Sequence, residues 1–210
     1  MTSVSTVSID SRHPSPDILR RASRLLLEGE IVAAPSDTVY GYLALPRSTR
    51  ARESLRILKG RTGPFIVLVR SWEEARSWTR DVQEPVWSRL QDVWPGPVTV
   101  ILPTDADMPG AENGTIGLRM PDSVFLTALL EEVGEPLFST SANRPGDPPP
   151  VSADQVVAKL SDAVALVLDA GSAESSQPST VVEMVHGSAR VVRMGRGDAG
   201  PLLDRSPPAS

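Results

Sequence analysis

The chain has 210 residues, a net charge of −5 and a pI of about 5.1, and 40% of its residues are hydrophobic. The acidic balance excludes a protein coated with positive charge for nucleic acid. The absence of cysteine excludes disulfides and cysteine nucleophiles, and two histidines are too few for a histidine-rich metal site. No run reaches the roughly 20 apolar residues of a membrane span, and residues 1–14 lack a signal-peptide pattern. We therefore expect a cytoplasmic protein.

Hydrophobic patterning predicts alternating helices and strands. Ser15 and Pro16 begin a helix whose apolar stripe ends at Gly29. Further helices are expected over 48–58, from Ser71, over 84–93, from Asp122 to Gly134 and from Ser152. Strands are expected over 31–35, 65–69, 98–102, 115–119, 137–139, 164–168, 180–184 and 190–193.

This alternation predicts one α/β domain over residues 15–197. Several of the strands follow one another without a helix between them, so the sheet is expected to be mixed. Residues 1–14 are predicted to be a flexible arm. Residues 198–210, rich in Pro, Gly and Ser, are predicted to be a disordered tail.

The most informative stretch is Pro35–Gly41, which directly follows the apolar run of the predicted strand, Ile31–Ala34. It combines hydroxyl side chains, a carboxylate, a phenol and a glycine. Such a set at the end of a strand is typical of ligand sites in α/β folds. An ordinary polar loop is the alternative interpretation.

Other polar groups follow helices and strands in the same way. Lys59-Gly60-Arg61 ends a helix, where it either compensates the helix dipole or clamps a phosphate or carboxylate. The run from Ser139 to Asn143 suits hydrogen bonds to a nucleotide, or forms a simple turn. The remaining candidates lie at the ends of predicted strands: Arg119, Ser179, Thr180 and Arg193.

No motif for a nucleophile or a phosphate-binding loop is present. The chain contains no G-x-x-x-x-G-K-[ST], G-x-G-x-x-G or G-x-S-x-G sequence. A protein with anion and hydroxyl ligands but no nucleophile would catalyse by positioning and charge stabilisation.

From Gly29 to Gly195 the chain resembles the YrdC/TsaC family of threonylcarbamoyl-adenylate synthases. Each motif is weak alone, and the resemblance depends on seven in the family's order. They are Pro35-Ser36-Asp37-Thr38-Val39-Tyr40-Gly41, Lys59-Gly60-Arg61, Trp94-Pro95-Gly96-Pro97, Gly117-Leu118-Arg119-Met120-Pro121, Ser141-Ala142-Asn143, Pro178-Ser179-Thr180-Val181-Val182 and Arg193-Met194-Gly195.

The resemblance implies a single-domain, open, twisted mixed α/β sheet with flanking helices around a basic cleft. It implies that L-threonine, bicarbonate and ATP, with Mg²⁺ of unassigned ligands, give threonylcarbamoyl-AMP and pyrophosphate. It also implies that partner proteins pass the group to tRNA. The implied threonine-binding residues are Thr38, Arg119 and Ser179. The implied ATP-binding residues are Lys59, Arg61, Thr115, Ser139, Ser141, Asn143 and Arg193, with Lys59 and Arg61 catalytic.

Two alternatives to the synthase remain open. One is a non-catalytic member that binds tRNA or double-stranded RNA, and the other is a diverged paralogue that transfers carbamoyl groups to another acceptor. The retained hydroxyl set favours the synthase, since a binding module would need only the cations. Two departures from the family's pattern favour the alternatives. The loop after Arg61 is shorter than is usual in the family, and Pro178 stands where a glutamate commonly precedes Ser-Thr.

Overall fold

The computed structural model describes residues 4–60, 64–159, 163–185 and 188–203. Ten strands form one mixed sheet in the order β1-β8-β2-β3-β7-β4-β6-β5-β9-β10. The strands are β1 Ser5–Ser8, β2 Ile31–Ala34, β3 Gly41–Ala44, β4 Ile66–Leu68, β5 Val98–Pro103, β6 Thr115–Arg119, β7 Leu137–Ser141, β8 Val164–Asp169, β9 Thr180–Val185 and β10 Ser188–Arg193. The predicted single-domain α/β class with a mixed sheet is confirmed.

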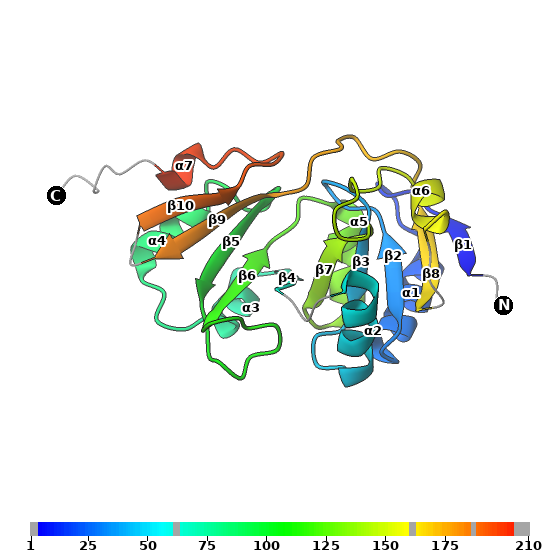
Figure 1. The fold of residues 1–210 in the computed structure, drawn as a ribbon, viewed down its shortest axis with the longest axis horizontal. Helices are drawn as coiled ribbons and strands as arrows, with labels where there is room; N and C mark the ends of the chain where they lie inside the picture. The colour runs from blue at the N-terminus through cyan, green and yellow to red at the C-terminus, as the bar shows by residue number, and fades with distance from the viewer. Residues whose placement is uncertain (1–3, 61–63, 160–162, 186–187, 204–210) are drawn as a thin grey trace.

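The sheet contains both parallel and antiparallel strand pairs. Strands β1, β8 and β2 run parallel, as do β4 with β6 and β5 with β9. The strand pairs β2–β3, β3–β7, β4–β7, β5–β6 and β9–β10 are antiparallel. Figure 1 shows that the sheet twists strongly, so that its two halves face the viewer at different angles on either side of β4.

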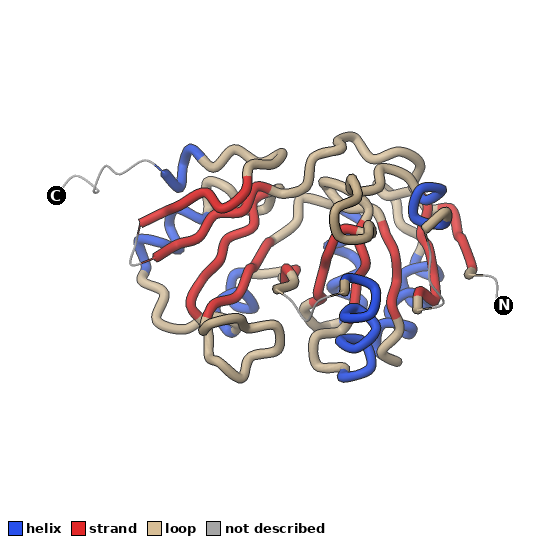
Figure 2. Tube along the Cα trace, in the orientation of Figure 1, coloured by secondary structure: helices blue, strands red, loops and turns tan. Residues whose placement is uncertain are grey.

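Helices lie on both faces of the sheet, as the tube view makes clear (Figure 2). They are α1 Pro16–Leu27, α2 Thr49–Lys59, α3 Trp72–Ser77, α4 Glu84–Leu90, α5 Val124–Val133, α6 Ala153–Val157 and α7 Gly200–Leu203. In the half that holds β2 and β8, α1 and α5 lie behind the strands and α2 lies in front (Figure 1). None of the helices in the described ranges is long and apolar enough to cross a membrane.

Two buried clusters reflect these two layers. Helices α1 and α5 bring Leu19, Leu26 and Phe125 against strand residues such as Leu166. The spacing of the buried residues in α1 matches one face of a helix, as the sequence predicted. The other cluster contains Leu55 of α2 together with the central strands and three tryptophans near α3 and α4. Burial on both faces explains why β2 and β4 are continuously apolar.

Both ends of the chain differ from the prediction. The predicted flexible arm at 1–14 is wrong for Ser5–Ser8, which forms β1 and pairs in parallel with β8. A strand of four residues with alternating burial has too short a pattern to recognise in sequence. The predicted disordered tail is wrong for Gly200–Leu203, which forms α7 and buries Leu202 completely. The domain bounds 15–197 therefore leave out ordered residues on both sides.

Two elements in the middle of the chain also depart from expectation. Helix α5 begins at Ser123 rather than Asp122, because the Ser123 hydroxyl accepts a hydrogen bond from the Leu126 amide at 3.3 Å. Strand β3 was not predicted, and it forms an antiparallel hairpin with β2. The polar heptad is therefore a turn between two strands, and its site residues are fixed at both ends.

Tyr40 anchors this turn to the rest of the fold. Its side chain is fully buried, and its hydroxyl donates to the Gly171 carbonyl at 2.7 Å and accepts from the Ala170 amide at 3.0 Å. Burial raises the pKa of the Tyr40 phenol above its ordinary value. The motif residue is therefore structural, holding the β2–β3 turn against the segment after β8.

Candidate functional site

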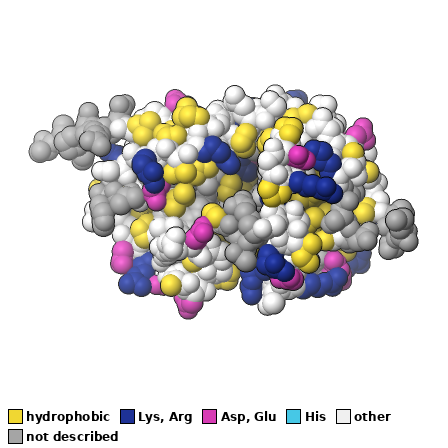
Figure 3. All heavy atoms as spheres, in the orientation of Figure 1, with side chains coloured by type: hydrophobic (Ala, Val, Ile, Leu, Met, Phe, Trp, Pro, Cys, Tyr) yellow, Lys and Arg dark blue, Asp and Glu magenta, His cyan; other side chains and the backbone are white. Residues whose placement is uncertain are grey.

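A cavity of about 390 Å³ gathers most of the residues selected from the sequence. Its wall is built from β3, β4, β5, β6, β7, β9 and the turn before β3. It includes Thr38, Thr115, Arg119, Ser139, Ser141, Ser179 and Arg193. The space-filling view of this face shows a hollow near the middle of the molecule, with cationic side chains at its rim (Figure 3). The volume falls within the range usual for small-molecule sites.

Lys59 lies next to this cavity, in contact with the Ser141–Asn143 segment. Helix α2 ends because Gly60 adopts a left-handed conformation with φ 61°, which leaves Lys59 as its last residue. The ammonium donates to the Ser141 carbonyl at 2.9 Å, the Asn143 carbonyl at 2.7 Å and the Asn143 Oδ1 at 3.1 Å. Lys59 is only 4% exposed. It therefore links the first cationic motif to the hydroxyl motif, which are far apart in sequence.

The segment after β7 is ordered by its own side chains. The Ser141 hydroxyl donates to Asn143 Oδ1 at 2.5 Å, and Asn143 Nδ2 donates to the Asp147 carbonyl at 2.6 Å. Lys159 forms an ion pair with Asp147 and donates a hydrogen bond to its carboxylate. This hydrogen bond lowers the pKa of the Asp147 carboxyl. Asn143 is thus oriented before any ligand arrives, as pre-organised recognition requires.

The Thr38 hydroxyl has a defined hydrogen-bond polarity. The Ser36 hydroxyl donates its single proton to the Val39 carbonyl at 2.7 Å, so Thr38 must be the donor in the 2.9 Å contact between the two hydroxyls. Thr38 Oγ1 then accepts from Arg119 Nη1 at 3.4 Å. Its remaining lone pair offers the cavity an acceptor. A ligand would therefore present an N–H or O–H group to Thr38.

Arg119, the last residue of β6, is almost completely buried at 3% exposure. Its Nη1 lies 3.3 Å from Asp37 Oδ1, and the Asp37 side chain is also buried. Removing one partner of such a pair costs about 3–5 kcal/mol of folding free energy. Contacts to Asp37 and Thr38 therefore hold Arg119 in place where it lines the cavity.

Ser179 and Arg193 lie in direct contact, although the family resemblance assigns them to different ligands. Arg193 Nη2 donates to the Ser179 carbonyl at 2.8 Å and to its hydroxyl at 3.3 Å. The Ser179 hydroxyl also meets the Thr99 hydroxyl at 2.9 Å. This contact brings the proposed amino acid and nucleotide groups together on one wall of the cavity.

Some residues predicted for the site are not tested by these contacts. Arg61 lies outside the described residues. The charged residues lining the cavity among those described are Arg119, Arg193, Glu112 and Glu183, so the basic character expected of the cleft stays a prediction. Within the described ranges, no cluster of three or more His, Asp or Glu side chains is arranged to hold a metal ion.

Sequence reasoning missed several residues that shape the site. Ser36 and Asp37 were seen as part of a polar turn, but the sequence does not show that one fixes Thr38 and the other Arg119. Thr99 gave no signal, because it lies inside a strand with apolar neighbours. The Trp94–Pro97 motif has a structural role: the Gly96 amide donates to the Met120 carbonyl, and the Pro97 carbonyl accepts from the Thr180 amide.

Gly195 holds the segment after β10 close to Pro178 and Ser179. A Cβ there would lie 2.2 Å from the Pro178 carbonyl oxygen and 2.5 Å from the Ser179 carbonyl carbon. We expect Gly195→Ala to lower the free energy of unfolding by about 1–3 kcal/mol, because backbone must move to relieve the clash. Thermal unfolding measures this. Gly117→Ala is the control, since its Cβ would meet nothing nearer than 3.5 Å; equal melting temperatures for the two variants would contradict the expectation.

The fold and the cavity together define an α/β domain with one polar ligand site across the middle of a mixed sheet. Residues 24–195 match the Sua5/YciO/YrdC family model, described as "Telomere recombination". The chain belongs to this family.

Comparisons with individual proteins agree with this family assignment. The chain is 36% identical over 172 residues to a putative threonylcarbamoyl-AMP synthase of Mycobacterium tuberculosis, with 80% of this chain and 79% of that protein covered. The crystal structure of E. coli YciO superposes with a TM-score of 0.86 at 25% identity, covering 95% of this chain and 100% of that one. Sua5 of Pyrococcus abyssi in complex with L-threonine gives a TM-score of 0.82 at 27% identity. That match covers 92% of this chain but 58% of the Sua5 chain, so this protein spans little more than half its length.

Proposed function

We propose that this protein is a threonylcarbamoyl-AMP synthase that acts on L-threonine, bicarbonate and ATP. The observation that carries the proposal is the single cavity in which hydroxyl and cationic groups from distant motifs meet. The relatives named threonylcarbamoyl-AMP synthase support the same activity. The product would then serve tRNA modification, with transfer to tRNA made by partner proteins.

The amino acid half of the site is assigned to Arg119, Thr38 and Ser179. Arg119 offers a planar fork to the threonine carboxylate. The acceptor that Thr38 presents suits the amine or the hydroxyl of threonine, both of which carry protons. Ser179, which directly precedes β9, completes the set. The complex of a related Sua5 with L-threonine supports this choice of ligand.

The nucleotide half is assigned to groups near Lys59. Arg61 and Arg193 would face the phosphates, where negative charge accumulates during adenylyl transfer. Lys59 would hold the Ser141–Asn143 segment in place beside them. The hydroxyls and amide would hold the rest of ATP: Thr115, Ser139, Ser141 and Asn143. Mg²⁺ would enter with ATP, held largely by the phosphates, and Glu112 and Glu183 are the carboxylates lining the cavity among the described residues.

The chemistry consists of two bond-forming steps. The threonine amine attacks the carbon of bicarbonate, and water leaves to give a carbamate. A carbamate oxygen then attacks the α-phosphorus of ATP, and pyrophosphate leaves with the electron pair of the broken P–O bond. None of these steps needs a protein nucleophile, so positioning and charge stabilisation carry the reaction.

The test is direct product detection. We expect the purified protein, incubated with ATP, L-threonine and ¹³C-bicarbonate, to form pyrophosphate and threonylcarbamoyl-AMP that mass spectrometry finds labelled. Omission of each substrate is one control. Arg47→Gln is a second control that should keep the activity, because Arg47 pairs with Glu135 on the exposed surface. Tight tRNA binding without product would favour the RNA-binding alternative. Carbamoyl transfer from carbamoyl phosphate without adenylate would favour the paralogue.

A further inference from the structure

The buried ion pair between Asp37 and Arg119 makes few hydrogen bonds. The side chains are 7% and 3% exposed, and the closest charged atoms are 3.3 Å apart. Neither Asp37 oxygen has a hydrogen-bond partner among the described residues, and Arg119 Nε has none either. Burying two charges with few hydrogen bonds is a poor way to stabilise a fold. The pair therefore points to a role in ligand recognition.

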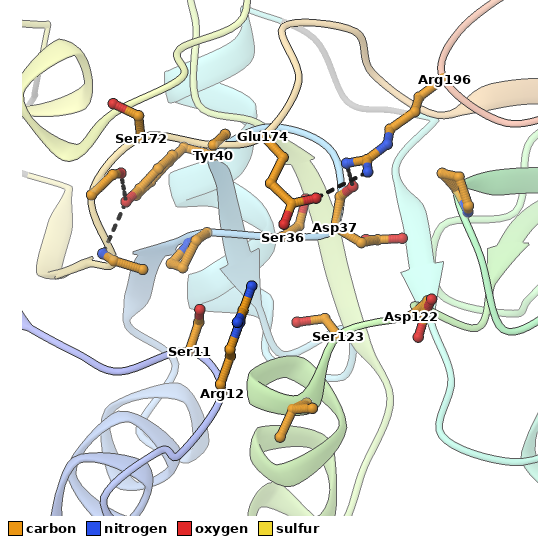
Figure 4. A pocket seen from close by; sticks show the side chains of 16 residues that line it. Ser11, Arg12, Ser36, Asp37, Tyr40, Asp122, Ser123, Ser172, Glu174 and Arg196 are labelled. Carbon is orange, nitrogen blue, oxygen red and sulfur yellow. Dashed lines mark hydrogen bonds and ion pairs between the residues drawn. The ribbon is translucent and has the colours of Figure 1, made fainter.

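A hydrogen bond also fixes the backbone of Asp37. Arg196 Nη1 donates to the Asp37 carbonyl at 2.7 Å, while Arg196 Nη2 pairs with Glu174 at 3.1 Å. Figure 4 shows this arrangement in a second cavity, of about 350 Å³, which lies on the other side of the Ser36–Asp37 segment. Asp37 lines this second cavity, and its carboxylate lies 3.3 Å from the guanidinium of Arg119, which lines the first.

This placement gives the part of the site around Arg119 no net charge. A bare carboxylate entering it is attracted by Arg119 but repelled by Asp37, and in a poorly solvated cavity both effects are strong. A zwitterion gains more, because its ammonium group is attracted by Asp37 and can donate to Thr38. The difference between the two ligands lies in the ammonium group alone.

We propose that Asp37 is a specificity-determining residue that makes the site select a zwitterionic amino acid over a carboxylate anion of the same shape. The inference rests on the proposed function, because it takes Arg119 as the carboxylate-binding group. Arg193, Glu112 and Glu183 line the cavity together with Arg119, and they are the same in each comparison below.

The probes are L-threonine and 3-hydroxybutyrate, which is threonine without its amino group. Calorimetric titration should show that the wild-type protein binds threonine at least about tenfold more tightly than 3-hydroxybutyrate. In Asp37→Asn, this preference should fall by at least about tenfold, since the anion loses a repulsion and the zwitterion loses an attraction. Glu174→Gln is the matched control. It also removes a carboxylate near this turn, but an exposed one, and should keep the wild-type preference.

Each outcome decides between the readings. If Asp37→Asn weakens both ligands by the same factor, Asp37 is merely structural and the proposal is overturned. If the variant does not fold, the wild-type measurement still decides, because equal affinity for the two probes contradicts selection for a zwitterion. Threonine binding with an unchanged preference in Asp37→Asn overturns this inference alone. A wild-type protein that binds no threonine overturns the proposed function itself.

Discussion

Lys59→Met is expected to reduce adenylate formation by about 100-fold or more, because the Lys59 ammonium holds the Ser141–Asn143 segment and a small misplacement of positioning groups has this cost. The methionine keeps the length and apolar stem of the side chain but removes the ammonium. Three acceptors on Ser141 and Asn143 then lose their donor inside a site where Lys59 is 4% exposed. The nucleotide-binding segment after β7 would lose its link to α2.

The same variant should lower the free energy of unfolding by about 1–3 kcal/mol, because buried carbonyls are left unpaired. Steady-state pyrophosphate release and thermal unfolding measure the two effects. Lys159→Met is the control, since that lysine pairs with Asp147 near the same segment but is 38% exposed. Full turnover by Lys59→Met would remove Lys59 from the site, and an equal loss in Lys159→Met would mean that any disturbance of the segment suffices.

The sequence allowed the fold class and most of the site to be predicted, for identifiable reasons. Strands β6, β7 and β10 end in Arg119, Ser141 and Arg193, and the chemistry of these end residues is visible without coordinates. The C-terminal cap at Gly60 and the apolar stripe of α1 depend only on residues that are close in sequence, so the sequence alone predicts them. The seven motifs in order then pointed to a family that the matched region 24–195 confirms.

The remainder depended on contacts between distant residues. Nothing in the sequence shows that Asp37 meets Arg119 or that Thr99 meets Ser179, because these pairs form only when the sheet is assembled. Strand β1 was missed for the same reason, since it is defined by pairing with β8 near the other end of the chain. The sequence indicated Arg119 as a ligand-binding candidate, but its burial could not be foreseen.

This burial sharpens what Arg119→Lys should do. A lysine retains the positive charge opposite Asp37, so the variant should fold, whereas Arg119→Ala would leave a buried carboxylate unpaired at a cost of about 3–5 kcal/mol. A single ammonium cannot contact Asp37 and Thr38 and also grip a carboxylate with two parallel bonds.

We therefore expect Arg119→Lys to weaken threonine binding by about tenfold or more, which is the loss of one charge-assisted hydrogen bond. ATP binding should be nearly unchanged, because the groups assigned to ATP near Lys59 keep their own contacts. Separate calorimetric titrations with threonine and with a non-hydrolysable ATP analogue measure this. Equal weakening of both ligands would mean that Arg119 shapes the whole cavity. Unchanged affinity for both would show that the carboxylate of threonine binds elsewhere.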